Sequence, residues 1–142
     1  MECDPKKVPN KYLRLALRRI DGENYSEALQ YKHSAVIVKA GRVLSVGRNR
    51  NKTHPDAVGS DEYGNPFCRS IHAEMDAIAR VKNKEQLRGA IIYVARKGKT
   101  GAPGMSCPCT MCQNQINRYG LKRAVFTTDY GTGTLEFTGE VA

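Results

Sequence analysis

The sequence lacks any long hydrophobic run. No stretch of its 142 residues approaches the roughly 20 consecutive apolar residues that cross a bilayer, so no membrane span is expected. The basic start, with Lys6 and Lys7, is followed by no continuous apolar core, which argues against a secretory leader. Internal repeats, low-complexity tracts and a linker between domains are absent as well. We therefore expect a single domain, residues 1–142, with one hydrophobic core.

Acidic residues are scarce relative to basic ones. The chain has 23 Lys and Arg against 14 Asp and Glu, a formal net charge of +9. A positive surface of this size favours a phosphate-bearing partner, a nucleotide or a polynucleotide, although a merely solvated basic exterior has the same composition. The chain has no aromatic-rich basic stretch. Stacking aromatics normally accompany the basic groove of single-strand binders, so this absence counts against single-stranded nucleic acid.

Cysteines are few and unevenly placed. Their number, five, is odd, and three of them fall within residues 107–112. A secreted disulfide framework would spread its cysteines along the chain. The crowding instead indicates a metal site, and we expect the protein to work in a reducing cytoplasm.

Hydrophobic periodicity predicts an α/β fold. Helical spacing is found in residues 9–20, in a helix that opens at His72, and in residues 109–118. Short apolar runs predict five strands, at residues 34–38, 42–47, 90–95, 123–128 and 134–138. The segment 49–66, rich in Asn, Asp, Gly and Pro, is expected to be a long loop. This order of elements predicts a mixed five-stranded sheet with helices on its faces.

Two of the strands can be placed more closely. The run at 90–95 (AIIYVA) is wholly apolar, as expected of a centre strand covered on both faces. Only residues 129–133 connect the last two strands, whereas a parallel return needs about a dozen residues or more. We therefore predict that strands 123–128 and 134–138 pair antiparallel.

A Cys-x-x-Cys motif stands at the head of the third predicted helix. Cys109 and Cys112 are three residues apart, so both sulfurs share a helical face and can reach one ion. A helix N-terminus and a metal both lower the pKa of a thiol, which supplies the thiolates that a metal needs. By itself the motif also fits a redox pair or a zinc knuckle.

His72 and Glu74 open the preceding helix, and strand 90–95 separates them from the cysteines. In a helix–strand–helix unit both helices run alike, so their N-terminal ends can converge. One imidazole and two thiolates give Zn²⁺ three protein ligands and leave a fourth position for water, the mark of a catalytic site. Zinc lowers the pKa of that water toward about 7, and Glu74 can pass its proton to a departing amine.

His-Ala-Glu at residues 72–74 followed by Pro-Cys-x-x-Cys at residues 108–112 resembles the signature of the cytidine deaminase superfamily. The resemblance spans residues 34–128 and implies a three-layer fold, zinc held by the histidine and the two cysteines, and the glutamate as general acid and base. It also implies that Asn49 contacts the sugar, that the backbone of Ala73 binds the carbonyl of the base, and that the protein is a homo-oligomer.

Further residues are candidates for contact with substrate. Arg48 flanks Asn49, where a 5′-phosphate would fall. His54 lies in the long loop that follows, and backbone groups of Ser106 would line the pocket. Asp76 stands where relatives often have asparagine, and we interpret it as a first-turn acid favoured by the helix dipole.

The leading hypothesis is hydrolytic deamination of cytosine in a free (deoxy)cytidine nucleoside or nucleotide, giving uracil and ammonia. Deamination of cytosine or adenine in a polynucleotide is the alternative, and purine substrates stay open. The histidine ligand is similar to that of deoxycytidylate and tRNA adenosine deaminases, whereas an antiparallel end of the sheet is similar to free-nucleoside cytidine deaminases. A non-enzymatic module is a third possibility, because Cys68 lies four residues before His72 and would close a structural Cys₃His zinc cage. We interpret His33 as an ordinary residue beside a buried strand.

Overall fold

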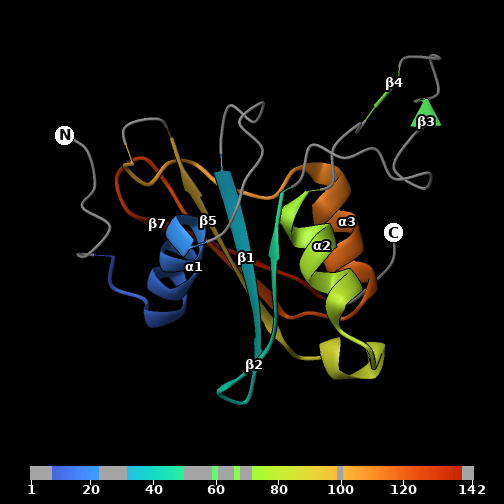
Figure 1. Ribbon diagram of the computed structural model, residues 1–142. Coiled ribbons are helices and arrows are strands. Elements are labelled where there is room, and N and C mark those ends of the chain that lie inside the picture. The colour runs from blue at the N-terminus through green and yellow to red at the C-terminus, as the bar shows by residue number, and fades with distance from the viewer. Residues whose placement is uncertain are drawn as a thin grey trace.

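The computed structural model describes residues 8–22, 32–49, 59–60, 66–67, 72–98 and 101–138. Its helices are α1 (Lys11–Gly22), α2 (Ala73–Arg80), α3 (Thr110–Arg118) and the short 3-10 helix η3 (Lys84–Leu87). Its strands are β1 (Lys32–Lys39), β2 (Arg42–Arg48), β3 (Gly59–Ser60), β4 (Pro66–Phe67), β5 (Ile91–Lys97), β6 (Arg123–Thr127) and β7 (Thr132–Glu136). Figure 1 shows three layers, with α1 on one side of the main sheet and α2 and α3 on the other. None of the helices in the described ranges has the length and apolar character needed to cross a bilayer.

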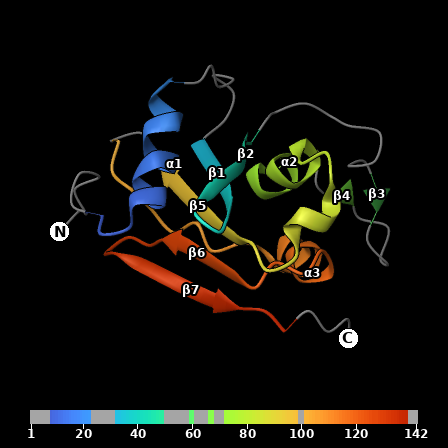
Figure 2. The same cartoon turned by 90° about the horizontal axis from the view of Figure 1, so that it is seen from below.

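The main sheet has the strand order β2-β1-β5-β6-β7. Strand β1 pairs antiparallel with β2 and β5, whereas β5 and β6 are parallel. The sheet is therefore mixed and five-stranded. The apolar run AIIYVA, residues 90–95, forms most of its central strand β5, as predicted. The antiparallel pairing of β6 with β7 is confirmed, and Figure 2 shows β7 lying beside β6 at the edge of the sheet.

The central strands bury side chains on both faces, because successive residues of a strand point to opposite sides. The face of β1 and β5 that packs under α2 and α3 presents Ala35, Ile37, Ile92 and Val94. The face that packs under α1 presents Val36, Val38, Tyr93 and Ala95. Two close-packed cores thus hold the central strands, which gives the starts of α2 and α3 a rigid support.

The hairpin of β1 and β2 depends on the predicted turn at residues 39–41. Ala40 and Gly41 have φ of 50° and 79°, the left-handed conformation that a two-residue hairpin of this type requires at both central positions. Further along β2, Gly47 lies against α2. A Cβ on Gly47 would be 2.3 Å from the backbone nitrogen of Ala77 and 2.5 Å from the backbone oxygen of Ala73. Strand β2 and helix α2 therefore meet backbone to backbone, which only glycine permits.

The prediction of a long loop at residues 49–66 needs a correction. Gly59–Ser60 and Pro66–Phe67 pair as a separate two-stranded antiparallel sheet. Two-residue strands are too short to show hydrophobic periodicity, so the pattern of the sequence does not reveal them. The helix η3 also has no counterpart among the predicted elements. It begins after Asn83, whose side chain accepts a hydrogen bond from the N–H of Glu85 at 3.1 Å.

Candidate active site

His72, Cys109 and Cys112 lie together where α2 and α3 begin. One ligand atom of each residue lies within 4.8 Å of those of the other two. The Nδ1 of His72 is 3.3 Å from the Sγ of Cys112 and 3.7 Å from the Sγ of Cys109. The convergence expected from the helix–strand–helix unit is therefore present in the structure.

Both helices begin at members of this cluster. His72 is the N-cap of α2 and Cys109 is the N-cap of α3, each in an extended backbone conformation. An N-cap side chain usually accepts a hydrogen bond from the first helical turn, yet neither of these two makes such a bond. Their side chains approach each other instead. Both helix N-termini, each with a partial positive charge, thus lie at the cluster.

The donor set and its spacing fit Zn²⁺. Zinc binds imidazole nitrogen at about 2.0–2.1 Å and thiolate sulfur at about 2.3 Å, so tetrahedral angles separate the nitrogen from each sulfur by about 3.6 Å. The two N···S distances of 3.3 and 3.7 Å lie on either side of this value. Three protein ligands leave one tetrahedral position for another group, as in catalytic zinc sites.

Burial controls the protonation of the ligands. Cys112 is 0% exposed, and burial, followed by the Glu74 carboxylate and Cys109, raises the pKa of its thiol. Burial lowers the pKa of His72, which keeps the imidazole in the neutral form that binds metals. A divalent cation reverses this preference at Cys112, because it pairs with the thiolate that burial alone disfavours.

Glu74 is buried beside these ligands. It belongs to the first turn of α2, and its side chain lines the same cavity as His72 and Cys109. Burial raises the pKa of its carboxyl group, and hydrogen bonds from its own backbone N–H and from the Cys112 thiol oppose the shift only in part. A raised pKa makes the carboxylate a better proton acceptor, as general acid–base catalysis requires.

A cavity of about 240 Å³ opens at the cluster. It is lined by His33, Asn49, His72, Ala73, Glu74, Ser106, Cys107 and Cys109. Three residues predicted to contact substrate, Asn49, Ala73 and Ser106, therefore border the same space as Glu74. The volume lies below the roughly 300–1,000 Å³ of sites for drug-sized ligands, so the space suits a small molecule.

His33 also borders the cavity, although we interpreted it as an ordinary strand residue. Its backbone N–H donates to the Oδ1 of Asn49 at 2.8 Å, and the N–H of Asn49 donates to its carbonyl oxygen at 3.4 Å. Burial, followed by Arg96 and His72, lowers the pKa of His33 to about 4, so the ring is neutral at neutral pH. A signal was available in the sequence, because His33 is two residues before Ala35, which faces α2.

Ser106 is held by β5 and β6. Its hydroxyl donates to the carbonyl oxygen of Val94 at 2.7 Å and accepts from the N–H of Thr127 at 3.0 Å. Its own N–H donates to the carbonyl oxygen of Thr127 at 2.9 Å. These bonds fix the loop that leads into Cys109, and they occupy the Ser106 hydroxyl within the protein.

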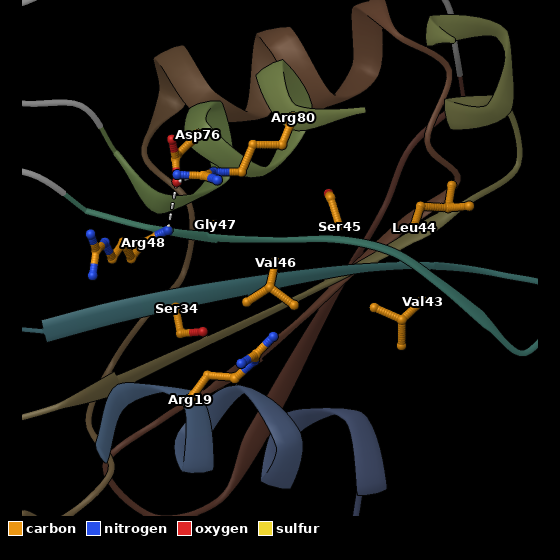
Figure 3. A pocket seen from close by; sticks show the side chains of 10 residues that line it. All are labelled: Arg19, Ser34, Val43, Leu44, Ser45, Val46, Gly47, Arg48, Asp76 and Arg80. Atoms are coloured by element: carbon orange, nitrogen blue, oxygen red, sulfur yellow. Dashed lines mark hydrogen bonds and ion pairs between the residues drawn. The ribbon is translucent and has the colours of Figure 1, made fainter. Parts of the chain in front are cut away.

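The other predicted contacts lie elsewhere. The structure does not bring the Arg48 side chain into the cavity at the cluster. Arg48 instead lines a second cavity of about 550 Å³ along β2, together with Arg19 of α1. In Figure 3 its guanidinium points away from α2, whereas its backbone nitrogen faces Asp76. His54, predicted to contact substrate, and Cys68, considered as a fourth ligand of a structural site, both lie outside the described residues.

Known proteins share this sequence pattern. A family model described as the cytidine and deoxycytidylate deaminase zinc-binding region matches residues 7–128. The deoxycytidylate deaminase of Schizosaccharomyces pombe is 26% identical over 118 residues, which cover 74% of this chain and 33% of the relative. The chain thus spans about a third of the length of the curated relative that it matches.

Solved structures share the fold. The dCMP deaminase of the cyanophage S-TIM5, in complex with dCMP and dUMP, matches with a TM-score of 0.55 and 22% identity over 84% of this chain and 79% of that one. The cytidine deaminase of Burkholderia pseudomallei matches with a TM-score of 0.59 and 19% identity over 91% and 93%. At such low identity these likenesses establish the three-layer fold alone.

Proposed function

Because the chain belongs to the cytidine and deoxycytidylate deaminase zinc-binding family, we propose that it is a zinc-dependent hydrolytic deaminase of a nucleobase. The favoured substrate is cytosine in a free (deoxy)cytidine nucleoside or nucleotide. Water replaces the amino group at C4, so the products are uracil and ammonia. The observation that carries the proposal is that His72, Cys109 and Glu74 border one cavity, with Cys112 within ligand distance of the first two.

In this proposal His72, Cys109 and Cys112 hold Zn²⁺. When bound, zinc would act as a Lewis acid that lowers the pKa of water to about 7. The neutral imidazole of His72 provides a nitrogen lone pair for such a cation. Because both cysteines must stay reduced to bind metal, we place the protein in a reducing compartment such as the cytoplasm.

Glu74 moves the protons of the reaction. Its carboxylate takes a proton from the attacking water and donates it to the nitrogen that leaves C4. One group can serve both steps because burial raises its pKa above the ordinary range of a carboxyl group. Its place two residues after His72, in the first turn of α2, supports this role.

Asn49 and Ala73 hold the substrate. The first N–H groups of a helix have no acceptor within the helix, so the N–H of Ala73 can donate to the carbonyl of the base. We assign Asn49 to the sugar, because it borders the cavity and the N–H of His33 anchors its Oδ1 there. Ser106 lines the same cavity, and we assign its backbone to the substrate pocket. His54 stays a candidate for contact with substrate.

We also propose that residues 1–142 form one deaminase domain and that the protein is a homo-oligomer. The family match over residues 7–128 supports the first proposal, because it leaves little of the chain for a second domain. Light scattering of the purified protein tests the second, with an expected mass of at least two chains.

An ammonia-release screen tests the proposed function. The S. pombe relative is named deoxycytidylate deaminase and the cyanophage structure contains dCMP and dUMP, so dCMP is the first compound to assay. Cytidine, deoxycytidine, CMP, the corresponding purine compounds and short oligonucleotides follow. We expect ammonia and a uracil product from a free cytosine nucleoside or nucleotide. A Glu74→Gln preparation with matched zinc content controls for contaminating deaminases.

Other outcomes of the screen have defined meanings. Ammonia from oligonucleotides alone would replace the proposal with a polynucleotide deaminase. Full zinc occupancy without ammonia from any compound would leave a non-enzymatic zinc module.

A further inference from the structure

The end of β2 is bound to α2 by one buried carboxylate. The N–H of Asn49 donates to the carbonyl oxygen of His33 on β1. Because backbone groups alternate in direction along a strand, the N–H of Arg48 points the other way, out of the edge of the sheet. The Oδ2 of Asp76 accepts this N–H at 3.0 Å, as Figure 3 shows. Asp76 therefore does more than complement the helix dipole.

Asp76 is itself held in one orientation. The Nε of Arg80, one turn later on α2, donates to the same Oδ2 at 3.0 Å. The Arg80 side chain is 49% exposed, so this ion pair alone contributes little to the stability of the fold. Asp76, however, is 1% exposed, and a carboxylate that is buried so deeply needs both donors. Its position is consequently well defined.

Strand β2 and helix α2 are in close backbone contact. Gly47, the residue before Arg48, meets the backbone of α2 directly, with no room for a Cβ. Asn49, the residue after Arg48, reaches into the cavity and binds the backbone of His33. A shift of this strand end would thus move Asn49 and His33 relative to Glu74.

We propose that Asp76 is a positioning residue for the substrate pocket: it ties the Arg48–Asn49 end of β2 to the helix that carries Glu74. This inference rests on the proposed deaminase function. Arg48 takes part through its backbone N–H, and Asp76 acts on substrate only through Asn49 and His33.

Two substitutions at one position test the role. Asp76→Ala removes the acceptor, and we expect KM for the best substrate of the screen to rise about tenfold while kcat changes less than about threefold. Asp76→Asn keeps an oxygen for the Arg48 N–H, so both constants should stay within about threefold of the parent. Rescue by the asparagine variant is the sign of positioning through a hydrogen bond.

Ser45→Ala is the matched control. The Ser45 hydroxyl donates to the carbonyl oxygen of Ala77 at 2.7 Å, so it also ties β2 to α2, but three residues before Arg48. We expect this variant to leave KM unchanged. Equal KM increases in Ser45→Ala and Asp76→Ala would show that any loosening of this interface has the same effect, and the specific role would be wrong.

Amide hydrogen exchange gives a readout that needs no activity. In Asp76→Ala the N–H groups of Asn49 and His33 should exchange at least about tenfold faster than in the parent, and in Ser45→Ala they should not. Unchanged exchange and KM in Asp76→Ala would overturn the inference. If the parent releases no ammonia from any compound, the proposed function fails while the exchange result still decides the mechanical link.

Should Asp76→Ala fail to fold, Arg80→Gln decides, because it alters a half-exposed side chain. A KM increase of about threefold, with faster exchange at Asn49, would support the inference. Unchanged KM and exchange in this variant would contradict it.

Discussion

Two buried carboxylates on the first turn of α2 have opposite surroundings. Asp76 faces β2, where the Arg48 N–H and the Arg80 guanidinium both donate to it. Glu74 faces the cavity, where burial raises its pKa. Its hydrogen-bond donors are its own backbone N–H and the Cys112 thiol, which offset the effect of burial only in part. The two residues are 1% and 6% exposed, so burial alone does not distinguish them.

The difference teaches that the neighbours of a buried acid determine its use. A carboxylate that accepts from a guanidinium and from the backbone of another element is held in one place and serves as a structural acceptor. A buried acid whose pKa is raised by burial, and which faces a cavity, is suited to proton transfer. Two residues apart on α2, Glu74 is therefore suited to proton transfer and Asp76 to holding β2 in place.

Among changes to the site that contains Glu74, loss of a metal ligand should have the largest effect on zinc content and stability. We expect Cys112→Ala to lose zinc, activity and much of the stability, because the free energy of metal binding contributes to folding. Metal analysis of the purified protein should fall from about one zinc per chain to near zero. Cys107→Ser is the matched control, since Cys107 borders the cavity but is not in the ligand cluster. It should keep its zinc.

Cys68→Ser asks whether the site is open or closed. An open catalytic site has three protein ligands, so this variant should retain both zinc and activity. Loss of zinc from Cys68→Ser would mean a closed Cys₃His cage and would remove the role assigned to Glu74.

Ser106→Ala should have the next largest effect, because it weakens the support shared by the cavity and the sheet. The substitution leaves the N–H of Thr127 and the carbonyl oxygen of Val94 without their hydroxyl partner in a buried setting. We expect the free energy of unfolding, measured in urea, to fall by about 2–3 kcal/mol. Ser45→Ala removes one bond at a half-buried position and should cost about 1 kcal/mol or less. Equal decreases in the free energy of unfolding of the two variants would show that the Ser106 hydrogen bonds stabilise the fold no more than the Ser45 bond does.

A smaller effect is expected from His33 at acid pH. Burial, then Arg96 and His72, lower its pKa from 6.5 to about 4 in the folded protein. Between these values the unfolded chain binds a proton that the folded chain does not, so stability falls as the pH drops from about 6.5 toward 4. Between pH 7.5 and 5 this site should remove about 2 kcal/mol. His33→Gln should lose correspondingly less over the same range in urea titrations, and an equal loss would count against a lowered pKa.

Much of the fold and the cluster could be predicted from the sequence because both depend on local spacing. The short apolar runs at 34–38 and 90–95 predicted the strands, and a five-residue connection sufficed to predict that β6 and β7 are antiparallel. Cys109 and Cys112 share a face for the same local reason. The helix–strand–helix order then brought His72 to them.

Long-range contacts were harder to predict. His33 enters the cavity only because β1 pairs with β2 beside Asn49, and Asp76 meets Arg48 only because Gly47 admits α2 so closely. The Arg48 side chain points away from α2 because Arg48 pairs with Ser34, a register that the hydrophobic pattern does not specify. Such features depend on how separate elements pack together.

The most direct test compares Glu74→Gln with Asp76→Asn, two nearly isosteric changes on one helical turn. Ammonia release per bound zinc is measured for both on the substrate that the screen identifies. We predict that both retain about one zinc per chain. Glu74→Gln should lose turnover by about 10⁴-fold or more, because one group serves both proton transfers, whereas Asp76→Asn should stay within about threefold of the parent. Turnover of Glu74→Gln within tenfold of the parent, or inactivation by Asp76→Asn instead, would contradict the assignment of Glu74 as the proton-transfer group.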